Sequence, residues 1–251
     1  MISCHRSLVT FVGLLLSWSG LSAPLSPILK EREEGRALAA ELCRQRPTEN
    51  VELTGVLKSR DGASQRSELV IRFQVVIGDG FWKAVYQTQP GQRAGAEKLM
   101  VIHSEGRPNQ YLIARAEKAW SQLPELVPSL QPMKPFAGTD FWLADLGLEF
   151  LHWPEQRLVK NEMRRGRSCK VLESTNPQPG KGAYSRVRSW IDSESAQLIR
   201  AEAYDSENRL LKEFSVGSVK KVRGRWELKD MEIRNEQTDS LTRLEFDLDE
   251  N

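Results

Sequence analysis

The sequence predicts a mainly β protein with a few helices, organised around one large antiparallel sheet. The last third of the chain holds six strand-like runs that follow one another almost without interruption, each closed by a turn. Strands of this length joined by hairpins form a single sheet, which must curl or be covered to hide one face. The runs carry no pattern typical of a catalytic site. They are Ser168–Ser174, Tyr184–Ile191, Gln197–Tyr204, Leu210–Val216, Trp226–Arg234 and Leu241–Leu248.

The first residues have the pattern of a secretory signal peptide. Met1–Leu8 is short and basic, Val9–Trp18 is apolar, and the small residues of Ser17–Ala23 follow. An apolar run this short does not span a bilayer permanently. We expect cleavage after Ser22, so that residues 1–22 are the signal peptide and residues 23–251 form a single mature domain. The alternative is an uncleaved membrane anchor.

A helix is predicted at the start of the mature chain, over Ser26–Arg46. Ser26 is a suitable N-cap residue and Pro27 occupies a favourable first helical position. The apolar stripe is patchy at first, so the helix is predicted most firmly over Glu34–Arg44. Pro47 ends the helix.

A first set of strands follows this helix. The turn Gly78–Gly80 between two apolar runs is a strong hairpin signal. Five runs in this set and six in the last third predict a sheet of about eleven strands, and Gln156–Met163 is a possible further strand. The runs of the first set are Val51–Lys58, Glu68–Ile77, Phe81–Gln87, Lys98–His103 and Gln110–Ala114.

The middle of the chain changes character. Ser121–Thr139 carries too many prolines for a helix or an inner strand, so it is interpreted as a long crossover within one domain rather than a linker between two. Thr139 and Asp140 are then expected to cap a helix over Phe141–His152, the most apolar stretch of the mature chain.

The charge balance gives no net attraction to nucleic acid or to an acidic membrane. The chain has 36 Lys and Arg against 34 Asp and Glu, and removal of Arg6 with the signal peptide lowers the formal charge from +2 to +1. Two basic runs, 157–170 and 220–225, are interpreted as a solvated outer face. No nucleic-acid partner is therefore expected.

The mature chain keeps two cysteines, Cys43 and Cys169. An even pair in an exported protein suggests one disulfide, which would tie the N-terminal helix to the first strand of the last third. In the chain-entropy model, a disulfide that closes such a long loop stabilises the fold by about 4–5 kcal/mol. Two separate buried thiols are the alternative, and the sequence leaves the choice open.

Motifs of enzymes and cofactor sites are missing from the sequence. It has no G-x-S-x-G elbow, no P-loop and no dinucleotide-binding glycine pattern. The two mature histidines, His103 and His152, are not spaced as a zinc-ligand pair. We therefore expect no catalysis, no cofactor and no metal. A carboxylate pair that acts on glycans stays open, because any two strands can bring such groups together.

A sheet of more than about eight strands encloses more volume than its own side chains fill. The surplus, lined by apolar and aromatic groups, would suit a lipid tail. Strand alternation places one residue of each neighbouring pair inward. We choose Val187 and Ile191 as inward, which directs Trp190 outward. The candidate lining residues are Trp82, Tyr86, Phe141, Trp142, Leu146, Phe150, Val187, Ile191 and Phe214.

Several segments of the second half resemble the outer-membrane lipoprotein-sorting protein family, the LolA-like group of exported bacterial proteins. The resemblance covers Val51–Asp249 and rests on order and spacing rather than on one sharp motif. It implies a half-open antiparallel barrel wrapped around an N-terminal helix and a lid or plug helix, with an apolar cavity for acyl chains. The segments are Phe141–Trp153, Ser168–Glu173, Tyr184–Asp192, Ala201–Asp205 and Leu210–Phe214.

Three functions follow as hypotheses. The favoured one, implied by the resemblance, is a periplasmic carrier that moves the acyl chains of lipoproteins or lipids toward the outer membrane, with sorting partners in the inner and outer membranes. The second is a non-catalytic interaction or scaffold domain whose interior is filled by its own side chains. The third is an envelope enzyme that acts on glycans through a carboxylate pair.

Overall fold

The structure is a computed structural model, and it describes residues 26–89, 96–116, 125–126, 132–222 and 224–248. The predicted signal peptide, residues 1–22, lies outside the described residues. So does most of the segment 117–131, which includes the first half of the predicted crossover.

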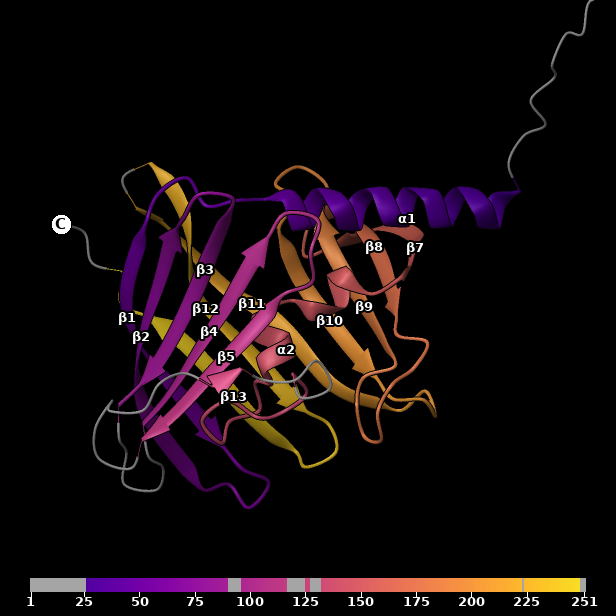
Figure 1. The fold of residues 1–251 in the computed structure, drawn as a ribbon. Coiled ribbons are helices and arrows are strands. Elements are labelled where there is room, and N and C mark those ends of the chain that lie inside the picture. Colours follow the sequence, from indigo (N-terminus) through magenta and orange to yellow (C-terminus); the bar gives the residue numbers. More distant parts are fainter. Residues whose placement is uncertain (1–25, 90–95, 117–124, 127–131, 223, 249–251) are drawn as a thin grey trace, which may run out of the picture.

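The described strands form one antiparallel sheet of 13 strands in the order β6-β5-β4-β3-β2-β1-β13-β12-β11-β10-β9-β8-β7. The sheet curls strongly but does not close, since β6 and β7 each pair on one side only, and it forms a half-open barrel (Figure 1). Its strands are β1 (Val51–Arg60), β2 (Arg66–Ile77), β3 (Phe81–Thr88), β4 (Ala96–Ser104), β5 (Gln110–Ala116), β6 (Glu125–Leu126), β7 (Glu155–Arg164), β8 (Arg167–Thr175), β9 (Arg186–Asp192), β10 (Leu198–Tyr204), β11 (Leu210–Val222), β12 (Arg225–Asn235) and β13 (Ser240–Phe246).

The predicted strands are confirmed, and their side-chain alternation separates an inner from an outer face. On β2, Leu69, Ile71 and Phe73 belong to the inner core, whereas Val70 is 48% exposed on the outer face. The short strand β6 was not predicted, because two residues carry no detectable alternation.

Helix α1 (Pro27–Arg44) begins where the sequence predicts. The backbone N–H of Leu29 donates to the Ser26 hydroxyl at 3.4 Å, which satisfies one of the free donors of the first turn. Figure 1 shows α1 across one end of the sheet, over β7 and β8. Gly35 makes this contact possible, because a Cβ there would lie 2.5 Å from the backbone of Arg157.

The buried face of α1 covers the inner side of the sheet edge. Leu38 and Ala39 pack against Leu172 of β8, which is fully buried. Leu151 joins the same cluster from the interior of the barrel. The helix therefore connects the edge of the sheet to the residues that occupy its concave side.

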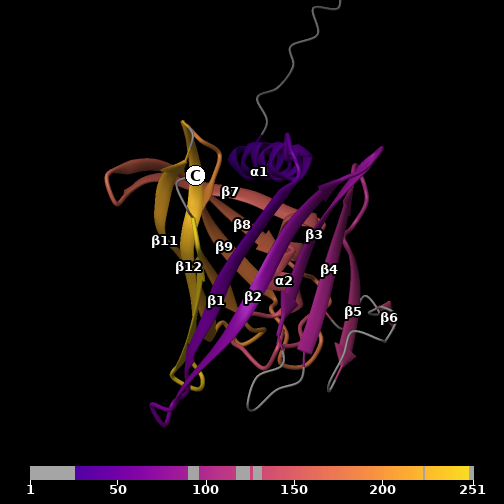
Figure 2. The same cartoon turned by 90° about the vertical axis from the view of Figure 1, so that its left-hand side faces the viewer.

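The single helix predicted over Phe141–His152 is not present in the structure. The segment forms the short α2 (Leu143–Leu146) and a 3-10 turn, η1 (Glu149–His152), and we call the two together the plug. They are separated at Leu148, whose φ of 48° is left-handed and stops helix propagation. The plug lies in the concave interior of the sheet (Figure 2).

The cap of the plug also differs from the prediction. Neither Thr139 nor Asp140 caps α2. The N-cap is Trp142, whose backbone N–H donates to the Asp145 carboxylate at 2.7 Å. The hydroxyl of Thr139 instead donates to the carbonyl of Phe136 at 2.8 Å.

Trp190 faces outward, as the alternation predicts, and is nevertheless only 4% exposed. It packs against Cys169 and Val171 on the outer face of β8. The guanidinium groups of Arg164 and Arg200 lie 5.0 and 5.7 Å from its ring centroid. Arginine side chains thus cover this tryptophan without a second helix layer.

The predicted disulfide between Cys43 and Cys169 is not formed, and both are free thiols. Cys43 lies on α1, on the inner side, 3.7 Å from the carbonyl oxygen of Leu151. Cys169 is fully buried in the cluster on the opposite face of β8. Two cysteines on opposite faces of a sheet cannot meet the distance and direction that a disulfide requires.

Candidate ligand cavity

An apolar cavity of about 510 Å³ lies between the sheet, the plug and the C-terminal end of α1; we call it cavity A. Its size falls in the range of small-molecule pockets, roughly 300–1,000 Å³. The wall belongs to strands from both halves of the sheet. The apolar residues of its inner part include Phe73, Tyr86, Phe141, Leu146, Leu148, Phe150, Ile191, Phe214, Met231 and Phe246.

A second cavity of about 640 Å³, cavity B, adjoins the first on the other side of the end of α1. It extends between the residues after α1, β3 and the β4–β5 turn, and contains Trp82 and His103. The shared wall consists of Leu42, Gln45, Phe73, Tyr86, Leu146, Leu148 and Leu151. The interior of the half-barrel therefore holds two adjoining hollows, with the end of α1 between them.

A buried ion pair fixes the plug to the sheet beside cavity A. Asp145 is the one carboxylate among the described residues that line this cavity. Its Oδ2 lies 3.5 Å from the Nζ of Lys212 on β11, and its Oδ1 accepts the Tyr184 hydroxyl at 3.0 Å. Lys212 is 2% exposed and its ammonium lies 3.7 Å from the ring centroid of Trp142.

Burial acts against both charges of this pair. It lowers the pKa of Lys212 to about 8, although Asp145 and Asp140 oppose the shift. Burial likewise raises the pKa of Asp145, while Lys212 opposes that shift. The pair is therefore held by its mutual contacts and would be costly to break.

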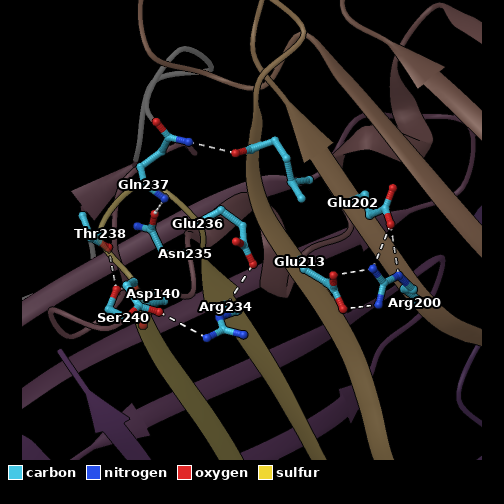
Figure 3. A network of polar contacts seen from close by, with 12 residues as sticks. Asp140, Arg200, Glu202, Glu213, Arg234, Asn235, Glu236, Gln237, Thr238 and Ser240 are labelled. Carbon is cyan, nitrogen blue, oxygen red and sulfur yellow. Dashed lines mark hydrogen bonds and ion pairs between the residues drawn. The ribbon is translucent and has the colours of Figure 1, made fainter. Parts of the chain in front are cut away.

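The segment before the plug is anchored at the same place. Lys212 donates from Nζ to the backbone carbonyl of Asp140 at 2.6 Å. The Asp140 carboxylate accepts the hydroxyls of Ser240 and Thr242 on β13 (Figure 3 shows Asp140 beside Ser240). The position of the plug is thus set by polar contacts, which leaves the apolar side of the plug facing the cavities.

The plug is also joined to β5 and to the residue just before it, at the wall of cavity B. Asn109 donates from Nδ2 to the carbonyl of Gly147 at 2.6 Å, and the Tyr111 hydroxyl donates to Glu149 at 2.8 Å. A Cβ at Gly147 would overlap the Tyr111 oxygen, so only glycine fits this approach. Burial raises the pKa of Glu149, although its hydrogen bonds oppose this.

Two histidines line cavity B. The His103 ring stacks on Trp82 with centroids 3.8 Å apart, and both nitrogens of His152 lie 3.9 Å from the Cys43 sulfur. Burial is the main cause that lowers the pKa of His103 to about 4; the nearby His152 acts in the same direction, and a hydrogen bond with Asn109 opposes the shift. Burial also lowers the pKa of His152. Both rings are therefore neutral at pH 7, which suits an apolar cavity.

The pKa of His103 predicts a loss of stability in acid. The unfolded chain takes up this proton near pH 6.5, whereas the folded protein takes it up only near pH 4. Between these values the unfolded state binds more protons, so the free energy of unfolding falls as the pH falls, by up to about 3 kcal/mol. In urea unfolding at pH 7 and pH 4.5, His103→Gln is expected to lose less stability than the wild type. Glu149 is present in both proteins, so its titration cancels in the comparison. Equal losses of unfolding free energy in the two proteins would contradict the prediction.

Seven of the nine predicted lining residues lie on the walls of the two large cavities. Cavity A contains Phe141, Phe150, Ile191 and Phe214, cavity B contains Trp82, and the shared wall contains Tyr86 and Leu146.

The other two predicted residues lie outside both cavities. Trp142 stacks on Tyr184 at 4.6 Å between centroids and covers Lys212. Val187 faces inward, as expected, but lines only a small hollow of about 20 Å³ beneath the plug.

Sequence reasoning missed the residues at the rim and in the shared wall. Leu42, Leu148 and Leu151 come from α1 and the plug, where the strand alternation used for the prediction does not apply. Arg165, Arg167 and Trp226 come from hairpin ends. Trp226 is 63% exposed, and its signal in the sequence is no more than its place among the six tryptophans of the mature chain.

Within the described ranges, no group of three or more His, Cys, Asp or Glu side chains could hold a metal ion. In the same part of the chain, no helix combines the length and the apolar character needed to cross a bilayer.

Comparisons with known proteins support the fold. A family model described as "-like: Uncharacterized protein" matches residues 82–248, more than half of the chain. No curated protein matches the sequence.

Three crystal structures share the architecture. A DUF1329 family protein from Desulfovibrio piger has a TM-score of 0.70 and 16% identity over 86% of this chain and 91% of its own. An outer-membrane lipoprotein-sorting protein domain from Vibrio parahaemolyticus has a TM-score of 0.70 and 20% identity over 86% and 92%. A LolA superfamily protein from Nitrosomonas europaea has a TM-score of 0.58 and 14% identity over 87% and 92%. The fold is therefore LolA-like.

Proposed function

This chain belongs to that family of uncharacterized proteins, and we propose that it is a periplasmic carrier that binds the acyl chains of lipids or lipoproteins in cavities A and B. The observation that carries the proposal is cavity A, an apolar hollow of about 510 Å³ inside a half-open barrel. The LolA-like fold adds support, since one similar structure is named as a lipoprotein-sorting protein domain.

The cavity walls suggest how an acyl chain is held. Phe141, Phe214 and Met231 offer apolar surface from the plug side and from the sheet, with few polar groups to satisfy. Each methylene removed from water contributes about 0.8 kcal/mol, so a chain of ordinary length gains much of its affinity from burial alone. Phe73, Tyr86 and Leu148 in the shared wall would let a long chain pass from cavity A toward cavity B.

We further propose that the chain is exported, cut after Ser22 and active as a single domain of residues 23–251. Carrier activity needs no catalysis and no cofactor. It needs only a difference between the affinities of the donor and the acceptor for the lipid. Donor and acceptor proteins in the inner and outer membranes would complete this role.

The size of the cavities weighs against the scaffold alternative. A scaffold domain would fill its interior with its own side chains at native packing density. Here two hollows of several hundred Å³ adjoin in the centre of the fold. The glycan-enzyme alternative gains no support from Asp145, because Lys212 and Tyr184 already hold that carboxylate.

Binding of amphiphiles by residues 23–251 tests the proposal. A dye that fluoresces in apolar surroundings should bind the purified protein and be displaced by palmitoyl lipids, and native mass spectrometry should detect one lipid adduct. Octanoyl analogues should displace the dye less well, because they bury fewer methylenes. Purified protein that binds neither the dye nor any palmitoyl lipid would rule the carrier out.

A further inference from the structure

The β7–β8 turn brings arginine to the rim of cavity A. Arg165 and Gly166 have φ values of 48° and 77°, as the central residues of a two-residue type I′ hairpin do. The exposed Arg165 side chain donates from Nη1 to the backbone carbonyl of Val216 at 3.1 Å. Its neighbour Arg167 also reaches the rim, but is paired with Asp192 at 2.7 Å. Arg165 is therefore the rim cation that has no carboxylate partner among the described residues.

A further hollow, of about 340 Å³, lies beside this rim and shares Arg165 and Ile199 with cavity A. Its walls are mostly polar, and no acidic side chain is among the described residues that form them. They are Met163, Arg164, Arg165, Ile199, Arg200 and Ser215. The arginine-lined hollow and the apolar cavity thus meet at two residues, Arg165 and Ile199.

The charges of the hollow are only partly compensated. Arg200 is neutralised by Glu202 and Glu213, as Figure 3 shows. Arg164 stacks over Trp190 and, like Arg165, forms no ion pair within the described part of the chain. Glu162, on the same strand, pairs with Lys160, and the nearby charge of Arg164 also lowers the pKa of Glu162, so Arg164 is compensated only in part.

We propose that the cargo of cavity A is an amphiphile with an anionic phosphate headgroup, which Arg164 and Arg165 bind while the acyl chain enters the cavity. This inference rests on the proposed function and names its ligand class. Guanidinium groups match phosphate oxygens in a bidentate geometry, and two adjacent arginines without an ion pair among the described residues lower the cost of bringing a phosphate to the rim. The hydroxyl of Ser215 supplies a further donor for a phosphate oxygen.

Two probes that differ only in the phosphate test this inference. Palmitoyl lysophosphatidic acid and monopalmitoylglycerol carry the same chain, and their dissociation constants are measured for residues 23–251 at low and high salt. We expect the phosphate probe to bind at least tenfold more tightly at low salt, with a smaller preference at high salt because screening weakens contacts at an exposed rim. Palmitate and inorganic phosphate serve as further probes.

The double variant Arg164→Gln/Arg165→Gln is expected to lose this preference and to keep its affinity for monopalmitoylglycerol. Arg32→Gln/Arg36→Gln removes the same charge from the exposed side of α1 and should keep the preference. The inference is overturned if the two probes bind equally, if the double variant keeps the preference, or if palmitate matches the phosphate probe.

Two further outcomes separate this inference from the proposed function. Equal binding of both palmitoyl probes leaves the carrier standing and removes only the phosphate headgroup. Binding of inorganic phosphate without binding of either palmitoyl probe contradicts both, and assigns the hollow to free phosphate.

Discussion

Replacing Lys212 with methionine is expected to lower the free energy of unfolding by about 3–5 kcal/mol at pH 7. Lys212 is 2% exposed, and its ammonium group is the cationic partner of Asp145. Methionine keeps most of the volume but leaves the Asp145 carboxylate buried without a counter-charge. It also removes the hydrogen bond to the Asp140 carbonyl, which holds the segment before the plug.

Two variants isolate the charge contribution. Lys212→Met/Asp145→Asn removes the uncompensated charge and should recover part of the lost stability, since the effects of substituting two residues in contact do not add. Lys58→Met removes a cation that pairs with Glu245 at the surface, with 45% of its side chain exposed, and should cost far less than Lys212→Met. Urea unfolding measures all three. A cost for Lys212→Met as small as that for Lys58→Met would show that the pair does not anchor the plug.

Replacing Val216 with tryptophan is expected to weaken the binding of palmitoyl lipids by at least about tenfold. Val216 lies on the inner face of β11, opposite Met231, and lines cavity A. An indole in this space displaces roughly two methylenes of the ligand, at about 0.8 kcal/mol each. The hydrogen bond from Arg165 is kept, because it goes to the backbone carbonyl of Val216.

The matched control is Val70→Trp, the same exchange at a position that is 48% exposed on the outer face of β2. It should leave lipid affinity unchanged, and both variants should unfold near the wild-type urea midpoint, since cavity A has room for the larger ring. Unchanged affinity of Val216→Trp, with its fold intact, would place the ligand elsewhere.

The sequence predicted the sheet well because its signal is local. Alternation and turn residues located every strand from β1 to β5 and from β7 to β13, and the same alternation directed Val187 and Ile191 inward and Trp190 outward. Alternation does not reveal that the outward-facing Trp190 is buried. That depends on Arg164 and Arg200, which come from other strands.

The plug was harder to predict, for a physical reason. Its apolar content suits a helix, but Leu148 adopts a left-handed conformation that leucine rarely takes, and tertiary contacts hold it there. Trp142 was expected in the cavity because it is large and apolar. It instead covers the ammonium of Lys212, a contact between segments 70 residues apart that no local pattern reveals.

The cavity rim and the cysteines also depend on spatial relations that no local sequence pattern reveals. Arg165 reaches cavity A only because the β7–β8 turn lies beside β11 in space. An even number of cysteines suggests a disulfide, but that number carries no information about the faces on which they lie, which is why the sequence leaves the choice open. The fold places Cys43 and Cys169 on opposite faces of β8, so they cannot pair.

Photo-crosslinking with a palmitoyl lysophospholipid that carries a diazirine at the end of its acyl chain tests most directly whether the half-barrel holds a lipid tail. Peptide mapping by mass spectrometry should place the cross-links on inward residues of β11, β12 and the plug, such as Phe214, Met231 and Leu148. Excess unlabelled lipid should suppress them. Cross-links confined to exposed residues such as Val70 or Ile28 would contradict binding inside the barrel.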